Sequence, residues 1–271
     1  QGGAAMFIQE GTYKYIPYHK LFRRTEFLNI NGNKKFEAYA NRDSLKYRSI
    51  YGLEEIPTMY RGTIRKVGFS RAWNIFIQLG MTDDSYTIEN SENMSYRDFV
   101  NLFLAYSPSD SVELKLRSYL KIDQDDIMWE KLIELDIFNP KKKIGLKNAT
   151  PAKMLQKILE ESWTLSKDDK DMIVMQHLFG YEKNGKKEQI ESSLIVYGEN
   201  QTYTAMAKTV GLPVGIAALK ILTGKIKTPG VQRPITREVY EPILKELSLY
   251  GIKFTERKVP YLGYNPNHVT G

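Results

Sequence analysis

The sequence predicts an α+β protein in which a sheet-bearing domain is interrupted by a helical insertion. Residues 1–69 and 167–271 carry alternating apolar patterns and turn signals that are typical of strands. Residues 70–166 instead carry short amphipathic runs with capping residues at their starts. We therefore expect residues 1–69 and 167–271 to form one α/β domain with C-terminal helices. Residues 70–166 are expected to form an all-helical subdomain inserted into it.

The first block is predicted to contain strands separated by turns. Residues 12–18 alternate between apolar and polar side chains and are rich in Tyr, as a half-buried strand requires. Asn31-Gly32-Asn33 predicts a turn, because these residues tolerate positive φ. Residues 43–51 have helical spacing that stops at Gly52. Further strands are expected at 36–39 and 57–67.

The middle block is predicted to be helical. Ser70 stands where it would cap a helix over 71–79, which Gly80 would end. Thr150 followed by Pro151 is the pattern of an N-cap and a first helical position, and it predicts a helix to about residue 161. Further amphipathic runs lie at 96–105, 111–120 and 127–135.

The last block begins with a predicted hairpin. Apolar runs at 171–182 and 188–197 flank Asn184-Gly185, and Asn-Gly between two such runs is a strong hairpin signal because both residues accept positive φ. A short strand is also expected at 252–255, close to the end of the chain.

Two helices are predicted to follow the hairpin. The first should run from near Thr202 to Gly224, and the second should be capped by Thr236 and stop at Gly251. The residues just before the first helix are typical of a capping segment. A second interpretation is that Thr202 and Tyr203 contact a cofactor.

Composition indicates a globular protein. Of the 271 residues, 42% are hydrophobic and 26% are charged, and no uninterrupted apolar run approaches the roughly 20 residues that span a bilayer. The absence of cysteine excludes disulfides, thiolate zinc sites and cysteine nucleophiles. No signal peptide is visible, so we expect a cytoplasmic protein, with a mitochondrial location as the alternative.

The charge balance points to a small anionic partner. A net charge of +7 raises nucleic acid as a candidate partner, but the basic residues are scattered and form no stripe interleaved with aromatic residues. We therefore expect neither nucleic acid nor membrane as a partner. Excess positive charge also steers a polyanionic substrate toward its site.

The sequence shows no motif for binding a nucleotide phosphate or a metal, and no motif that identifies a catalytic residue. No glycine-rich phosphate cradle of the GxGxxG or GxxxxGK[ST] type occurs after a predicted strand, so the pyrophosphate of a nicotinamide cofactor would have to be bound elsewhere. His19, His177 and His268 are far apart and lack metal spacing, so no metal site is expected. His19 stays open as a proton shuttle, with solvation as the alternative, and no catalytic residue is assigned.

The candidate binding residues gather between positions 39 and 69, where arginines stand beside aromatic residues. A strand is expected to give way to a helix at 39–43, which presents side chains and amide groups to one anion. A period of two along the next strand puts Arg61, Thr63 and Arg65 on one face. Guanidinium groups pair bidentately with carboxylates, although helix caps and surface ion pairs are the alternative roles. The candidates are Tyr39, Asn41, Arg42, Asp43, Arg61, Thr63 and Arg65.

Several stretches, in the same order, carry a family resemblance. They read YANRDSLKYRSIYGL, MYRGTIRKVGF, KDMIVMQHLFGYEKNGKK, YTAMAKTVGLPVGIAALKILTGKIKTPGV and EVYEPILKELSLYGI. Together they resemble saccharopine dehydrogenase of the L-glutamate-forming type, or saccharopine reductase, which also forms the C-terminal half of animal aminoadipic semialdehyde synthase. The resemblance covers most of the chain and is weakest over the helical block and the last dozen residues.

The resemblance implies a fold, a reaction and partners. The family has a variant Rossmann domain, a mixed β-sheet domain for substrate binding and dimerisation, and an inserted all-helical domain. The matching stretches start after the Rossmann strands, so we expect the substrate-binding and C-terminal portion. The implied reaction uses NAD or NADP to convert saccharopine to glutamate and aminoadipate semialdehyde, or runs in reverse, in lysine metabolism. The implied partners are saccharopine or a related amino-dicarboxylate, and a second copy in a homodimer.

The resemblance also selects residues. Arg65 matches the second arginine of the family's arginine-glycine-threonine-x-arginine motif, and Arg42 and Arg61 are the other expected carboxylate ligands. Ala40 departs from the family, which tends to have proline before asparagine-arginine-aspartate-serine, so the loop is expected to be less rigid. The alternative function is a non-catalytic dimerisation or carboxylate-binding module. Because the cofactor cradle is missing, we expect the chain alone not to turn over saccharopine.

Overall fold

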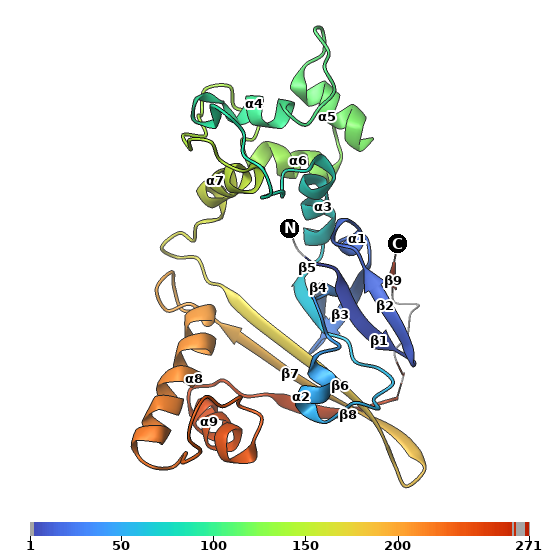
Figure 1. The fold of residues 1–271 in the computed structure, drawn as a ribbon, viewed down its shortest axis with the longest axis vertical. Helices are drawn as coiled ribbons and strands as arrows, with labels where there is room; N and C mark the ends of the chain where they lie inside the picture. Colours follow the sequence, from blue (N-terminus) through green and yellow to red (C-terminus); the bar gives the residue numbers. More distant parts are fainter. Residues whose placement is uncertain (1–2, 262, 264–268, 271) are drawn as a thin grey trace.

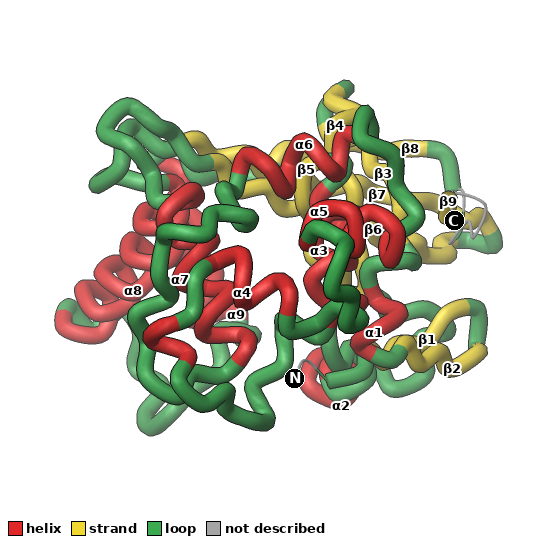
Figure 2. Tube along the Cα trace, turned by 90° about the horizontal axis from the view of Figure 1, so that it is seen from above, coloured by secondary structure: helices red, strands yellow, loops and turns green. Residues whose placement is uncertain are grey.

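The computed structural model describes residues 3–261, 263 and 269–270, and it confirms the α+β class (Figure 1). Helices α3 to α7 lie at one end of the molecule, and the strands occupy its middle and lower part (Figure 1). Helix α8 and the β1–β2 hairpin lie on opposite sides, as the view from above also shows (Figure 2). The division into a domain of residues 1–69 and 167–271 and an inserted subdomain of residues 70–166 stays a prediction.

The strands of the described residues form three small sheets, and the pairing within each is antiparallel, whereas the resemblance implied a domain with mixed β-sheet. The first is the hairpin of β1 (Ala5–Gln9) and β2 (Thr12–Ile16). The second has the order β5-β4-β3-β9 and contains β3 (Thr25–Ile30), β4 (Asn33–Ala40), β5 (Gly62–Lys66) and β9 (Val269–Thr270). The third contains the long hairpin and β8.

Two short helices interrupt the N-terminal strands: α1 (Tyr18–Leu21) and α2 (Tyr47–Tyr51). The expected helix over 43–51 starts later, because the Asp43 side chain accepts hydrogen bonds from the backbone N–H groups of Leu45 and Lys46 and holds a turn there. Gly52 ends α2 at φ 64°, as predicted. The expected strand over 57–67 is shortened to β5, since residues before it form only an isolated bridge at Met59.

The middle block is helical, as predicted. It contains α3 (Phe69–Leu79), α4 (Tyr96–Asn101), α5 (Val112–Leu120), α6 (Ile127–Glu134), α7 (Pro151–Trp163) and the short 3-10 helix η1 (Ser91–Asn93). These helices share one apolar core, in which Phe99, Met154 and Ile158 are completely buried. Thr150 caps α7 as expected, through a hydrogen bond from the Lys153 N–H.

The start of α3 corrects one sequence prediction. Ser70 is inside the helix and Gly68 is its N-cap residue. The cap is supplied by Glu37 of β4, a buried carboxylate that accepts hydrogen bonds from the N–H groups of Gly68 and Ser70 at 3.1 and 2.7 Å. A negative charge at a helix N-terminus satisfies free amides and complements the helix dipole. Glu37 therefore ties the central sheet to the helical block.

The long hairpin is confirmed. Strands β6 (Met172–Lys183) and β7 (Lys186–Tyr197) are joined by Asn184 and Gly185, which adopt φ values of 54° and 70°. Both values lie in the left-handed region that a two-residue hairpin turn requires. The last predicted strand is displaced toward the C-terminus, since β8 spans Thr255–Val259 and pairs with β7.

The two C-terminal helices are α8 (Ala205–Leu222) and α9 (Arg237–Leu249), and both were predicted. Thr204 caps α8, and Asp171 adds a second cap by accepting from the N–H groups of Ala205 and Met206 at 2.6 and 2.9 Å. Gly198 makes this possible, because a Cβ at that position would lie 2.1 Å from the Asp171 carboxylate.

Helix α8 corrects the expectation about apolar length. It has 18 residues and a mean hydropathy of 1.5, so in the described part of the chain one helix is long and apolar enough to cross a membrane. Only 17% of it is buried; Ala205 and Ile216 are buried in the core shared with α9 and β7, and Leu212 and Ala217 are partly buried against that core. The search for uninterrupted apolar runs in the sequence missed this length because Gly211, Pro213, Gly215 and Lys220 interrupt the longest run, residues 210–222.

Candidate functional site

The register of β4 and β5 shows how the predicted strand residues are arranged. Tyr39 lies opposite Thr63, and Glu37 lies opposite Arg65. Opposite residues in an antiparallel pair share a face, so Tyr39, Thr63 and Arg65 lie on the same side of the sheet. Arg61 precedes β5 by one residue and follows the same alternation. At roughly 3.3 Å per residue, the Cα atoms of Arg61 and Arg65 lie about 13 Å apart.

The turn at residues 41–43 is fastened to the start of β5. The Asn41 N–H donates to the Arg61 carbonyl at 2.7 Å, and the Arg42 carbonyl accepts from the Met6 N–H at 2.8 Å. Arg42 adopts φ 44°, a conformation that a non-glycine residue takes only in a tightly held turn. The backbone therefore joins Asn41 to Arg61, and it joins the next residue, Arg42, to Met6 of β1.

Asp43 and Ser44 support this turn. The Asp43 carboxylate accepts two backbone hydrogen bonds, from Leu45 at 2.9 Å and Lys46 at 3.3 Å. The buried Ser44 hydroxyl accepts from the Arg61 N–H at 3.1 Å. Asp43 thus has a structural role at the turn, which was one of the alternatives the sequence left open.

Aromatic rings orient the two strand arginines. The Arg61 guanidinium lies 4.1 Å from the centre of the Tyr47 ring. The Arg65 guanidinium lies 5.3 Å from the centre of the Phe69 ring and donates one hydrogen bond to the Ile64 carbonyl. Stacking on a ring fixes the plane of a guanidinium and leaves N–H groups at its edge for a planar anion. None of the described residues forms an ion pair with Arg42, Arg61 or Arg65.

A cleft of about 610 Å³ opens beside Tyr47, between α2 and the segment that leads into α9. Two of its lining residues, Lys46 and Arg233, are cations, and no lining residue is acidic. Its volume is within the roughly 300–1,000 Å³ of small-molecule sites. The cleft is lined by Lys46, Tyr47, Ile50, Tyr51, Arg233, Pro234, Ile235 and Tyr240. An anion with an apolar or aliphatic body fits this combination.

Sequence reasoning missed the cleft residues. Tyr47 and Tyr51 stack with ring centres 5.9 Å apart, and their spacing of four along a helix was a visible signal. Arg233 and Tyr240 come from the far end of the chain, and no local pattern relates them to α2. The tertiary structure alone brings them together.

The two cofactor candidates lie elsewhere. Thr202 and Tyr203 are in the turn before α8, and their N–H groups both donate to the Asn200 side-chain oxygen at 2.9 Å. This is a capping arrangement, although the Tyr203 ring is 61% exposed. In Figure 1, this end of α8 lies apart from β5. The structure therefore does not bring these residues together with the arginines.

The structure places two of the three histidines, and neither lies among the candidate arginines. His177 lies on β6 against Phe179 and Phe254, with ring centres 5.9 and 5.4 Å away, and partial desolvation lowers its pKa although the residue is exposed at the surface. His19 is an exposed residue of α1, and His268 lies outside the described residues. Over the described chain, no group of three His, Asp or Glu side chains is placed to hold a metal.

Fold and candidate site together define an α+β protein in which Arg61 and Arg65 lie against aromatic rings, with no ion pair to any described residue. Residues 1–252 match the family model of the saccharopine dehydrogenase C-terminal domain, and the chain belongs to this family. It is 34% identical over 223 residues to the mitochondrial alpha-aminoadipic semialdehyde synthase of Rattus norvegicus. It is 30% identical over 263 residues to saccharopine dehydrogenase [NADP(+), L-glutamate-forming] of Saccharomyces cerevisiae.

A solved structure shares the fold. The apo histidine-tagged saccharopine dehydrogenase (L-Glu forming) from Saccharomyces cerevisiae superposes with a TM-score of 0.81 at 30% sequence identity, over 94% of this chain and 59% of that one. The sequence match covers 80% of this chain but 24% of the rat protein, and 94% of this chain but 58% of the yeast protein. The chain therefore spans about a quarter and somewhat over half of these relatives.

Proposed function

We propose that this chain is the substrate-binding part of an NAD- or NADP-dependent oxidoreductase of the saccharopine dehydrogenase type. The observation that carries the proposal is the pair Arg61 and Arg65, which lie on one strand face, are stacked on aromatic rings and lack carboxylate partners among the described residues. A guanidinium that has no internal carboxylate keeps its N–H groups available for a carboxylate of a ligand. A ligand that supplies several carboxylates would meet both arginines.

Saccharopine has the required chemistry. It carries three carboxylates on two arms that are joined by a secondary amine, so it needs cations at separated points. Arg61 and Arg65 are about 13 Å apart along the strand, which suits carboxylates on different arms. Lys46 and Arg233 in the neighbouring cleft supply further cations, and Arg42, which follows Asn41 in the turn, is a third candidate. Tyr39 and Asn41 are the proposed hydrogen-bonding partners.

The reaction divides between binding and redox chemistry. In this proposal NAD+ or NADP+ would accept a hydride from the carbon beside the secondary amine of saccharopine, with release of a proton, and water would hydrolyse the resulting imine to glutamate and aminoadipate semialdehyde. This chain's residues hold and orient the carboxylates. Guanidinium groups suit that role because they stay charged at every physiological pH. We assign no general base within this chain.

Partners and location follow the same proposal. We propose a homodimer formed through the sheet domain, since β6 exposes Leu178 and Phe179 with more than half of each side chain accessible. A cytoplasmic or a mitochondrial location is compatible with the family, and the rat relative is named as a mitochondrial protein. Nucleic acid and membrane are not proposed partners.

Titration calorimetry of the purified chain with saccharopine tests the binding proposal. We expect saturable binding that Arg65→Ala weakens about tenfold or more, because a lost charge-assisted hydrogen bond costs about 1.5–3 kcal/mol. Arg237→Ala is the matched control, since Arg237 is an exposed arginine already paired with Glu241. Equal losses in both variants would show a general charge effect and remove Arg65 from the site.

A cofactor-reduction assay of the same chain tests whether it binds the substrate without carrying out the redox step. We expect no NAD or NADP reduction in the presence of saccharopine, because the sequence has no pyrophosphate cradle. Binding without turnover also fits a carboxylate-binding module. An assay with the corresponding full-length protein separates the two functions, because only the oxidoreductase reduces the cofactor there.

A further inference from the structure

A second cavity lies at the junction of the sheet region and the helical block, away from the cleft at α2. Its volume is about 410 Å³, and it lies between α1, α3 and α7. Three aromatic side chains line it: Tyr18, Trp73 and Trp163. The Trp73 and Trp163 rings have centres 6.3 Å apart and planes tilted by 35°, so they present their faces at an angle to each other.

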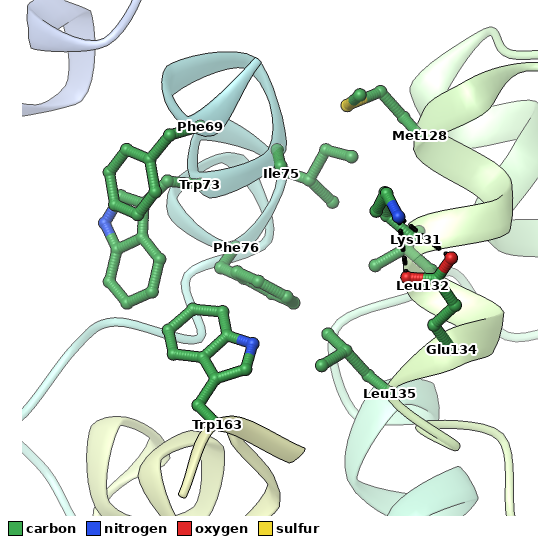
Figure 3. Close-up of a pocket in the computed structure, with 11 residues that line it drawn as sticks. Phe69, Trp73, Ile75, Phe76, Met128, Lys131, Leu132, Glu134, Leu135 and Trp163 are labelled. Atoms are coloured by element: carbon green, nitrogen blue, oxygen red, sulfur yellow. Dashed lines mark hydrogen bonds and ion pairs between the residues drawn. The ribbon is translucent and has the colours of Figure 1, made fainter. Parts of the chain in front are cut away.

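The same two tryptophans border a smaller cavity of about 120 Å³, whose lining Figure 3 shows. There Phe69 and Trp73 stack, with Trp163 below them, and the charged side chains at the far wall are Lys131 and Glu134 (Figure 3). Those two neutralise each other through hydrogen bonds of 2.7 and 2.8 Å. The smaller cavity therefore presents no uncompensated charge.

The larger cavity differs because its carboxylate has no cation. Glu160 lines it and accepts one hydrogen bond, from the Gln156 side-chain amide at 2.6 Å. No Lys or Arg lines the cavity, and within the described chain Glu160 forms no ion pair. The adjacent Glu161, in contrast, pairs with both Lys142 and Lys157. Glu160 is an exposed residue at the C-terminal end of α7, so its carboxylate is accessible to a ligand at this wall of the cavity.

We propose that this cavity binds an organic cation of the alkylammonium class. Aromatic faces carry a negative quadrupole that attracts ammonium groups, and the Glu160 carboxylate supplies the full opposite charge. Thr82, Gln156 and Thr164 add polar atoms at the wall. The volume accommodates a small amine with a short aliphatic body. This site is distinct from the arginine site, which selects the opposite charge.

The tryptophans provide the readout. The chain has three, and Trp73 and Trp163 are both in the cavity wall, with the Trp163 side chain 54% exposed. The probe is choline, and the control ligand is its uncharged carbon isostere, dimethylbutanol, at matched ionic strength. We expect choline to change tryptophan fluorescence saturably with a millimolar midpoint, and dimethylbutanol to give no saturable change.

Variants that remove single charges test whether the Glu160 carboxylate binds choline. Glu160→Gln should raise the choline midpoint about tenfold, because it removes a charge-assisted contact. Glu134→Gln is the matched control, since it removes a carboxylate from the smaller cavity, and it should leave the midpoint unchanged. Arg65→Ala should also leave it unchanged, which separates this result from the fate of the saccharopine site. Equal responses to choline and dimethylbutanol, no saturable response, or an unchanged midpoint in Glu160→Gln would each overturn the proposal.

Discussion

The helical block and the strand–turn segment at 39–66 use arginine in opposite ways. In the helical block, Arg97 donates from two guanidinium nitrogens to the two carboxylate oxygens of Glu113, and both side chains are about two-thirds buried. In the strand–turn segment, Arg61 and Arg65 lie on rings, with no carboxylate partner among the described residues. The total charge of the chain does not reveal this difference.

The comparison distinguishes arginines that already have an internal ionic partner from arginines that we propose bind the ligand. A guanidinium that already has an internal carboxylate contributes to stability and has little capacity left for a ligand. A guanidinium that is only stacked keeps its outer N–H groups free for an incoming carboxylate. Mutations in the two regions should therefore have opposite signatures, with loss of stability in one and loss of affinity in the other.

The largest expected effect is on affinity in the strand–turn segment. The double variant Arg61→Ala, Arg65→Ala should lower saccharopine affinity about a hundredfold or more, because each lost pair contributes about 1.5–3 kcal/mol. Its midpoint of urea unfolding should stay near that of the unmodified chain, since neither arginine has an internal ionic partner in the described structure. Calorimetry and urea titration of one preparation measure both. A marked loss of stability would contradict the comparison.

Arg97→Ala should show the reverse signature. We expect a loss of about 1–3 kcal/mol in unfolding free energy, between the values for exposed and buried pairs. Saccharopine affinity should not change. Arg71→Ala is the control, because the Arg71 side chain is 61% exposed in its pair with Asp126, and such pairs contribute under about 1 kcal/mol. If Arg97→Ala and Arg71→Ala lowered the unfolding free energy equally, burial would not determine how much an ion pair contributes to stability.

Tyr47 tests whether stacking matters for binding. Tyr47→Leu should weaken saccharopine binding about three- to tenfold, because a cation–π contact contributes roughly 0.5–1 kcal/mol when exposed and more when desolvated. Tyr47→Phe keeps the ring and should bind normally. If both variants bound as the unmodified chain does, the Tyr47 ring would not position Arg61.

A pH titration gives the smallest effect. The hydrogen bond from Arg97 is the main cause that holds the pKa of Glu113 below its usual 4.5. The folded state therefore binds fewer protons than the unfolded state, and this stabilisation is present above pH 4.5 and is lost as the pH falls further. Glu113→Gln should flatten the decline in stability below that pH. Urea unfolding at several pH values measures it, and an unaltered slope would exclude Glu113 as the source.

Local signals predicted much of the fold. The Thr150-Pro151 start of α7 and the Asn184-Gly185 turn were both correct, because capping bonds and positive φ values are decided within a few residues. The start of α3 was wrong at Ser70 for the opposite reason, since its cap comes from Glu37 on another element. Predictions based on sequence neighbours fail where a distant side chain supplies the bond.

The candidate site shows the same division. Alternation along the strand placed Arg61 and Arg65 on one face, and the β4–β5 register agrees. Whether Arg61 and Arg65 have carboxylate partners depends on which elements pack beside them. The alternation of residues along a strand does not predict that packing. The contribution of Arg233 to the cleft at α2 was equally hidden, because it comes from the other end of the chain.

The sequence by itself determined most of the longer helices, although not all of their starts, as well as the long hairpin, the shared face of the arginines and the family of this protein. These features depend on backbone geometry and residue order, which are local. The tertiary structure alone decided that Asp171 and Glu37 cap distant helices, that Tyr47 and Phe69 orient two arginines, and that Glu160 has no ion-pair partner among the described residues. Charge pairing is a property of neighbours in space, and only the fold decides which residues become neighbours.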